Sequence, residues 1–206
     1  MNIYLTADWH LFHENIIKYC NRPFNNVKEM HKRLVDEYKR KVTNKDVVFF
    51  IGDMGFYKPE EIRKIVEPLK GKKILVLGNH DKYGVSTYYR MGFHVVVNSA
   101  TIKVGKRIFN IEHIPRRSLS ELYRLFKVYI REGRLRKRPW KQIYYRLRKE
   151  WNKHKRPDGN WTICGHVHEA WLMKRKNINI GVDKWNFTPV HIQKIVRLID
   201  QHESNG

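Results

Sequence analysis

Cysteine is scarce in this sequence of 206 residues, and so are long apolar runs. The two cysteines, Cys20 and Cys164, allow a single disulfide and lack the mutual spacing of a metal site, so we predict reduced thiols. No apolar run approaches the roughly 20 residues that span a bilayer. The amino terminus also lacks the charged-then-apolar pattern of a signal peptide. We therefore predict a cytoplasmic protein that does not enter membranes.

Acidic side chains are few: 20 of them stand against 42 lysines and arginines, which gives a net charge of +22. Such an excess is larger than solubility requires and indicates a polyanionic partner. It is concentrated between Arg116 and Arg156, where 16 basic residues accompany three acidic ones. The hydrophobic fraction of 41% nevertheless indicates a globular protein. We predict one domain over residues 1–206 that carries a basic helical insertion at 116–158.

The first half of the chain alternates short apolar runs with amphipathic stretches. Between Val27 and Arg40 apolar residues recur every three or four positions, which predicts a helix with one face on a sheet. Pro59 opens a second helix at a position where its missing N–H has no cost. This alternation is typical of a layered α/β domain. The strands expected around these helices are 2–7, 47–51 and 73–77.

The second half is richer in strands. The runs 93–97, 100–104 and 107–111 lie close together, and Gly105-Lys106 between the last two is a candidate hairpin turn. We expect these runs to form a second, antiparallel sheet. The predicted fold class is thus α/β, a two-sheet β-sandwich flanked by helices. The remaining elements expected are strands at 161–164 and 177–182, a helix from about Ile192, and two helices within the basic insertion.

Five of the expected strands end on residue types that bind metals. Open α/β sheets bind their ligands at the carboxyl ends of the strands. Any one of these motifs is common by chance, and each aspartate alone could cap a helix, but capping does not explain the histidines. The motifs are Asp8-Trp9-His10, Gly52-Asp53, Gly78-Asn79-His80-Asp81, Glu112-His113 and Gly165-His166-Val167-His168.

Carboxylates, imidazoles and an amide oxygen are the mixture that two neighbouring divalent cations need. Such a pair lowers the pKa of a shared water enough to supply hydroxide near neutral pH. The absence of a thiolate suits Mn²⁺, our first choice, or Fe or Zn²⁺, rather than a structural zinc. The candidate metal ligands are Asp8, His10, Asp53, Asn79, His113, His166 and His168.

The order of these motifs resembles that of the calcineurin-like metallophosphoesterases. In that family Asp-x-His, Gly-Asp, Gly-Asn-His-Asp/Glu, a lone His and Gly-His-x-His follow one another, and all five are present here. The resemblance covers about residues 1–115 and 160–200. It implies phosphoester hydrolysis at two metals, through attack by a bridging hydroxide. It also implies that Asp8, His10 and His168 hold one metal, that Asn79, His113 and His166 hold the other, and that Asp53 bridges them.

The same resemblance implies catalytic roles for His80 and Asp81. His80 would lie over the metals, bind a phosphoryl oxygen and assist the leaving oxygen, while Asp81 would fix its tautomer. Outside the resemblance, His113 taken alone is ambiguous, because a lone histidine before Ile114-Pro115 is often structural. Asp183 is expected to cap a turn.

The basic insertion lies between His113 and His166, so both of its ends are expected near the metals. Its arginines and lysines suit phosphate contacts and its aromatic residues suit base stacking. Alternatively, the aromatic residues pack between helices and the charges form a solvated face. The candidate substrate or nucleic-acid contacts are Arg116, Arg117, Arg134, Arg136, Lys137 and Arg138.

Motifs and charge together predict a phosphodiesterase or nuclease-like enzyme acting on a nucleic acid or nucleotide. A phosphomonoesterase acting on small phosphates or phosphoproteins is the first alternative. A nucleic-acid-binding protein with a vestigial metal site is the second, and it predicts no effect of Asp53→Asn or His80→Ala.

Overall fold

The computed structural model of this chain describes residues 1–116 and 159–204. Its residues form two compact units, Met1–Pro115 with Trp161–Gly206, and Arg116–Asn160. The second unit lies almost entirely outside the described residues, and so do the helices expected in the basic insertion. Organisation as one domain with an insertion stays a prediction.

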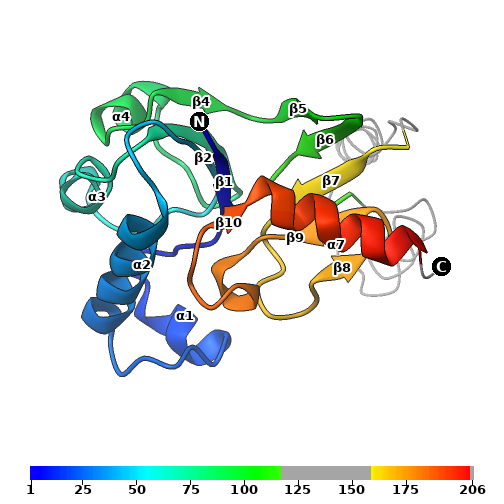
Figure 1. The fold of residues 1–206 in the computed structure, drawn as a ribbon. Helices are drawn as coiled ribbons and strands as arrows, with labels where there is room; N and C mark the ends of the chain where they lie inside the picture. Colours follow the sequence, from blue (N-terminus) through cyan, green and yellow to red (C-terminus); the bar gives the residue numbers. More distant parts are fainter. Residues whose placement is uncertain (117–158, 205–206) are drawn as a thin grey trace, which may run out of the picture. The chain divides into compact units, whose positions relative to one another are not determined.

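The first unit contains two five-stranded sheets flanked by helices, which is the predicted fold class (Figure 1). The first sheet has the order β10-β1-β2-β3-β4, in which β1 to β4 are parallel and β10 is antiparallel to β1. Its strands are β1 (Ile3–Thr6), β2 (Val47–Ile51), β3 (Lys72–Val76), β4 (Val95–Val97) and β10 (Val190–His191).

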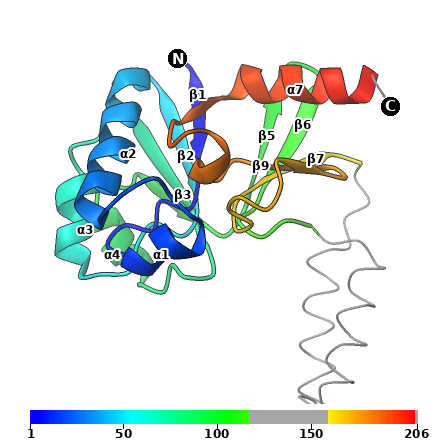
Figure 2. The same ribbon diagram turned by 90° about the horizontal axis from the view of Figure 1, so that it is seen from below.

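Four helices follow the strands of this sheet and cover one of its faces (Figure 2). The second of them begins after Asn26, whose side chain caps it by accepting from Glu29 N at 3.0 Å. It buries Met30, Leu34 and Tyr38, at the predicted spacing. Pro59 opens the third, also as predicted. The helices are α1 (Glu14–Tyr19), α2 (Val27–Lys41), α3 (Pro59–Val66) and α4 (Val85–Arg90).

The second sheet has the order β5-β6-β7-β9-β8. The β5–β6 hairpin turns at Gly105-Lys106, as predicted, and Gly105 takes a φ of 59° there. A short 3₁₀ helix, η1 (Val182–Lys184), follows β9, so this strand ends earlier than we expected. The sheet's strands are β5 (Ala100–Val104), β6 (Arg107–Ile111), β7 (Trp161–Cys164), β8 (Met173–Lys174) and β9 (Asn177–Asn179).

Two expectations about the second sheet are wrong. The run 93–97 belongs to the first sheet, because the unpredicted helix α4 carries the chain back so that β4 pairs parallel to β3. The second sheet is mixed rather than antiparallel, because β7 is parallel to both β6 and β9. Residues 112–160 join β6 to β7, and a parallel pair needs a long connection of this kind.

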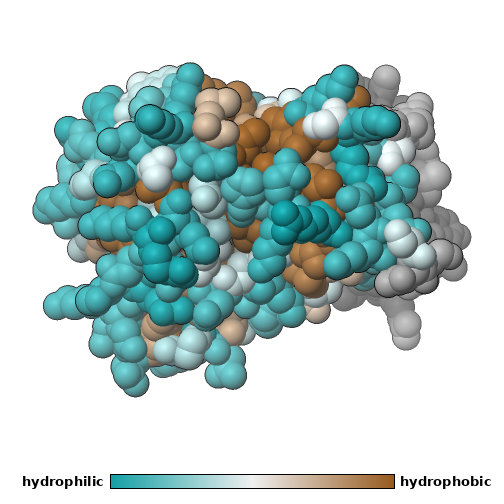
Figure 3. Space-filling model, viewed as in Figure 1, coloured by the Kyte–Doolittle hydropathy of each residue, from teal (hydrophilic) through white to brown (hydrophobic). Residues whose placement is uncertain are grey.

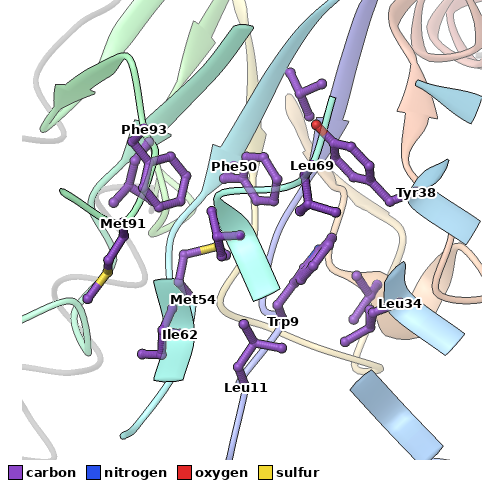
Figure 4. Close-up of a cluster of buried hydrophobic side chains, with 14 of the residues drawn as sticks. Trp9, Leu11, Leu34, Tyr38, Phe50, Met54, Ile62, Leu69, Met91 and Phe93 are labelled. Carbon is purple, nitrogen blue, oxygen red and sulfur yellow. The ribbon is translucent and has the colours of Figure 1, made fainter. Parts of the chain in front are cut away.

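Alternate residues of β2 face two different cores. Val48 and Phe50 lie in the core beneath the helices, whereas Phe49 and Ile51 lie in the core between the two sheets. Figure 4 shows the first core, in which Trp9 lies close to Phe50. The carboxyl-terminal helix α7 (Ile192–Ser204) buries its isoleucines on the second core. In Figure 3 the surface is mainly hydrophilic, with its main apolar area around β5 and α7.

Candidate metal centre

The loops that follow β1 and β2 run side by side at the carboxyl edge of the first sheet. Asp8 N donates to Gly52 O at 3.1 Å, and His10 N donates to Asp53 O at 3.0 Å. The parallel pairing of the two strands thus continues into the motifs, and it aligns Asp8 and His10 with Asp53. This is the meeting of strand ends that the sequence predicts.

Trp9 anchors the loop after β1 in the core beneath the helices. Its ring is only 1% exposed, and its Nε1–H donates to Thr6 Oγ1 at 2.7 Å. It packs edge-on against Phe50 and Tyr38, with ring centroids 5.3 and 5.9 Å away. Because Trp9 is buried among the helices, the chain on either side of it is fixed.

The backbone at the centre is strained. Five of the seven candidate ligands have φ between 46° and 71°, a left-handed region that residues with a Cβ avoid at a cost of about 1–2 kcal/mol each. Such strain is typical of functional sites, where the surrounding structure maintains it. The five residues are Asp8, His10, Asp53, His166 and His168.

Two glycines of the motifs make room for the carboxylates. A Cβ on Gly78 would lie 2.3 Å from Asp53 Oδ1, and a Cβ on Gly165 would lie 2.6 Å from Asp8 Oδ2. Neither distance is possible for a real side chain. The glycine in Gly-Asn-His-Asp and the glycine in Gly-His-x-His are therefore needed for close packing around the two aspartates.

The seven candidate ligands come together in two groups. Asp8, His10 and His168 offer ligand atoms within 4.8 Å of one another, and so do Asp53, His113 and His166. Asp53 Oδ2 lies 3.7 Å from His10 Nε2 and 3.3 Å from His113 Nε2, so one carboxylate oxygen faces an imidazole of each group. Asn79 Oδ1 joins the second group, 3.1 Å from His113 Nε2.

His113 is held in one orientation by the backbone. Its Nδ1–H donates to Ile51 O at 2.8 Å, so its Nε2 faces the oxygens of Asp53 and Asn79. The ring is 3% exposed, and a Cβ on Gly52 would lie 2.4 Å from Nδ1. An imidazole nitrogen and two oxygens that converge in this way match the donor set of a cation site.

Burial acts in opposite ways on the two aspartates. Burial is the main reason that the pKa of Asp8 is raised to about 6. Burial also raises the pKa of Asp53, but the hydrogen bond and charge of His113 and the His80 amide outweigh it and lower this pKa to about 2. The same carboxylates overcome the burial of His113 and raise its pKa to about 9. Two carboxylates with almost no solvent contact thus depend on nearby positive charge.

His10 provides the test of whether a metal fits. Its side chain is buried, yet neither ring nitrogen has a hydrogen-bond partner among the described residues. Burial also lowers its pKa to about 2, so the imidazole is neutral, the form that binds metals. Phe56 stacks on the ring at 5.4 Å and 9°. A buried, neutral imidazole without a partner beside two carboxylates fits a divalent cation.

His80 and Asp81 do different things. His80 is exposed, its backbone N–H donates to Asp53 Oδ1 at 3.0 Å, and its ring lies 6.2 Å from that of His10. The Asp81 carboxylate accepts from the amides of Asp53, Met54 and Gly78 at 2.8–3.1 Å. It thus ties the loop after β2 to the loop after β3, whereas we expected it to orient His80.

Arg22 and Asp183 are the residues that sequence reasoning missed. Arg22 donates to both carboxylate oxygens of Asp183, at 2.8 and 3.0 Å, and Asp183 Oδ2 lies 3.3 Å from His168 Nδ1. Asp183 is therefore not simply a turn cap. The available signal was its position, since it follows the expected strand 177–182 just as the other motifs follow theirs.

Cys20 also lies within 4.8 Å of His168 and Asp183. This group is a poor metal site for two reasons. Burial and the Asp183 charge raise the pKa of Cys20 to about 12, and the Asp183 carboxylate is already bound to Arg22.

The candidate substrate contacts cannot be placed in the same way. Arg117, Arg134, Arg136, Lys137 and Arg138 lie outside the described residues. Arg116 is described and half-buried, at the start of the second unit.

Comparison with known proteins identifies the family. The family model for calcineurin-like phosphoesterases matches residues 1–192. The chain belongs to the calcineurin-like phosphoesterase family. A relative in Methanocaldococcus jannaschii, the uncharacterized protein MJ1445, is 33% identical over 208 residues, which cover 97% of this chain and 92% of the relative.

The crystal structure of a protein of unknown function from Aquifex aeolicus, AQ665, shares the calcineurin-like fold of this chain. The two superpose with a TM-score of 0.64 at 21% identity, over 96% of this chain and 98% of the other. Membership of the phosphoesterase family implies a phosphate-bearing substrate and divalent metals, for which the two ligand groups are candidates. No helix in residues 1–116 and 159–204 is long and apolar enough to cross a membrane.

Proposed function

We propose that this protein is a phosphoester hydrolase that uses two divalent metal ions, and that it cleaves phosphodiesters in a nucleic acid or nucleotide. One observation carries the first part. Asp53 Oδ2 faces His10 Nε2 at 3.7 Å and His113 Nε2 at 3.3 Å, so a single carboxylate lies between the two ligand groups. This supports Asp53 as a bridge between two cations.

The chain's own residues suggest how the work is divided. Asp8, His10 and His168 would hold one ion and Asn79, His113 and His166 the other, with Mn²⁺ the best match to these oxygen and nitrogen donors and Fe or Zn²⁺ next. Two such ions supply Lewis-acid charge for the phosphoryl oxygens and a water of lowered pKa. His80, exposed beside Asp53, is available to donate a proton to the leaving oxygen.

The charge of the chain supports a polyanionic substrate. The net charge of +22 exceeds what folding or solubility needs, and the run from Arg116 to Arg156 contributes much of it. That run interrupts the chain between His113 and His166, two candidate ligands of the same metal. A polymer of phosphodiesters suits this charge better than a small monoester.

Hydrolysis assays with and without metal test the proposal. We expect Mn²⁺-dependent turnover that EDTA abolishes, faster with bis-p-nitrophenyl phosphate than with p-nitrophenyl phosphate. Asp53→Asn and His80→Ala should each lower kcat at least 100-fold. The matched controls are Asp36→Asn and His202→Ala, which alter exposed residues on α2 and α7.

Two other outcomes would replace the proposal. A strong preference for p-nitrophenyl phosphate would indicate a phosphomonoesterase. Nucleic-acid binding that is unchanged in Asp53→Asn, with no metal-dependent turnover of any substrate, would indicate a binding protein with a vestigial site.

The nucleic-acid part has its own test. Affinity for a short DNA or RNA should fall steeply between 50 and 200 mM salt, as expected when several phosphates are neutralised. Glutamine at Arg134, Arg136, Lys137 and Arg138 should weaken binding and flatten the salt dependence. Glutamine at four exposed lysines of α2 and α3 is the charge-matched control, at Lys28, Lys32, Lys39 and Lys64. Equal effects of the two sets would contradict a specific role for the insertion.

A further inference from the structure

Tyrosines are prominent among the exposed large apolar side chains of the described residues. Tyr57 is 47% exposed and Tyr83 is 36% exposed. Each follows one of the strand ends that carry the candidate ligands: Tyr57 comes four residues after Asp53, and Tyr83 comes four residues after Asn79. Exposed aromatic side chains that gather beside a functional site indicate a binding surface.

The two tyrosines belong to one surface. The Tyr83 hydroxyl donates to the backbone oxygen of Tyr57. The Tyr57 ring stacks on Phe12 at 5.0 Å and 24°, and the Tyr83 ring meets the buried Tyr88 edge-on at 5.9 Å. Each ring is thus supported on one side and exposed on another. A rigid, supported ring binds a planar ligand with little loss of conformational entropy.

Phe56 connects this surface to the metal centre. Its ring stacks on His10 and lies 4.8 Å from the His80 ring. Tyr57 is the next residue in the chain, so the aromatic surface adjoins the candidate ligand His10 and the exposed His80. The two tyrosines therefore connect to the metal centre through Phe56, the residue before Tyr57.

Each tyrosine has a lysine as its neighbour in sequence. Lys58 follows Tyr57, Lys82 precedes Tyr83, and both lysines are exposed. Aromatic faces combined with cations are the pattern by which proteins hold single-stranded nucleic acids, since bases stack on the rings and phosphates pair with the charges. A phosphopeptide or a simple sugar phosphate would use the lysines but not the rings.

We propose that Tyr57 and Tyr83 form a nucleobase subsite, on which a base next to the scissile phosphate stacks while Lys58 and Lys82 contact neighbouring phosphates. This inference rests on the proposed function and narrows its substrate class to nucleotides with an unstacked base. The subsite selects substrates and takes no part in the chemical step.

A binding experiment without hydrolysis tests the subsite directly. The full chain is titrated in EDTA with a fluorescein-labelled oligothymidylate of eight nucleotides and with an abasic strand of equal length. Wild type should bind the base-bearing strand at least tenfold more tightly, the size typical of one base–aromatic stack. Tyr57→Ala/Tyr83→Ala should lose this preference, whereas Tyr57→Phe/Tyr83→Phe should keep it.

Tyr89→Ala is the matched control, because Tyr89 is a 49% exposed tyrosine on α4, similar in exposure to Tyr57. It should retain the full preference for bases. A wild-type protein that does not distinguish the two strands, or a double alanine variant that still does, would overturn the subsite.

A kinetic experiment separates failure of the subsite from failure of the proposed function. With Mn²⁺, the double alanine variant should raise KM about tenfold for thymidine 5′-(p-nitrophenyl phosphate), with kcat unchanged. KM for methyl p-nitrophenyl phosphate, which has no base, should stay the same. An equal KM for the thymidine substrate in wild type and in the double alanine variant would contradict the subsite and leave the hydrolase proposal intact. If no protein hydrolyses either compound, the hydrolase proposal fails and the binding experiment still decides the subsite.

Discussion

Arg22 and Asp183, 161 residues apart in the chain, form a buried bidentate ion pair beside the candidate ligand His168. The same guanidinium donates to the backbone oxygens of Asp8 at 2.8 Å and Trp9 at 3.2 Å. Asp183 in turn accepts from His168 Nδ1, which directs the lone pair of His168 to Nε2. One ion pair therefore sets both the backbone of one candidate ligand and the tautomer of another.

Asp183→Asn is expected to weaken metal binding without removing a ligand. The amide cannot accept from His168 and hold Arg22 as the carboxylate does, and the loss of such a partner typically costs 10- to 100-fold in metal affinity. Isothermal titration with Mn²⁺ should show one weakened site and one unchanged site. Glu67→Gln, which breaks the exposed pair between Arg63 and Glu67, is the control. Two unchanged sites in Asp183→Asn would contradict this role.

Gly78→Ala is expected to abolish activity although it adds a single methyl group. Its Cβ would lie 2.3 Å from Asp53 Oδ1, so the carboxylate must move. We expect a loss of kcat of at least 100-fold and weaker Mn²⁺ binding. In the control Gly84→Ala, the nearest atom that the new Cβ would meet beyond its chain neighbours is Ser86 Oγ at 4.0 Å, and φ is −64°. The control should keep full activity, because the new methyl group has no close neighbour to displace.

Removal of metal is expected to destabilise the fold. Asp8 and Asp53 place two carboxylates in the interior, and bound cations would neutralise them. Mn²⁺ at about 100 times its Kd should add about 2.7 kcal/mol, which raises Tm by roughly 5–10 °C. Calorimetry with Mn²⁺ and with EDTA measures the shift. It should vanish in Asp53→Asn and persist in Asp36→Asn, and the same shift in both would argue against binding at Asp53.

Asp46 is expected to contribute to stability in a pH-dependent way, far from the metals. Its carboxylate accepts from the backbone and side chains of Asn2 and Thr43 at 2.7–3.1 Å. The backbone hydrogen bonds from Asn2 and Thr43 are the main reason that its pKa falls from 3.8 to about 2. Because the folded-state pKa is the lower one, the stabilisation is complete above about pH 5 and is lost as the pH falls towards 2.

Urea unfolding of Asp46→Asn measures this contribution. At pH 7 the free energy of unfolding should drop by about 1–3 kcal/mol, and the difference from wild type should shrink at pH 3. Asp36→Asn, in an exposed pair with Lys32, should match wild type at both pH values. A difference for Asp46→Asn that stays constant with pH would contradict the assignment.

The part of the centre that the sequence predicts is the part that follows parallel strands. Asp8, Asp53 and Asn79 each come directly after an apolar run, and the shared direction of β1, β2 and β3 brings them to one edge. Apolar periodicity predicts such strands, and the ligands follow from their ends.

The features that the sequence does not predict depend on contacts between residues far apart in the chain or on very short helices. Arg22 lies in a loop without periodicity and carries no local signal. Asp183 follows an expected strand, but its pairing with Arg22, 161 residues away in the chain, cannot be read from the sequence. Helix α4 has six residues, too few for an amphipathic pattern, so the sequence does not indicate that β4 pairs with β3 in the first sheet. Asp81 follows His80 in sequence, but its carboxylate instead accepts from the backbone amides of Asp53 and Gly78, which would otherwise lack a partner.

The left-handed backbone at five candidate ligands lowers the folding stability of the protein. Each of those residues would relax if its side chain were removed, because glycine adopts the same φ freely. Laboratory evolution that selects only for thermal stability, and not for catalytic activity, is therefore expected to enrich glycine at positions such as His168. The resulting protein would be more stable and inactive.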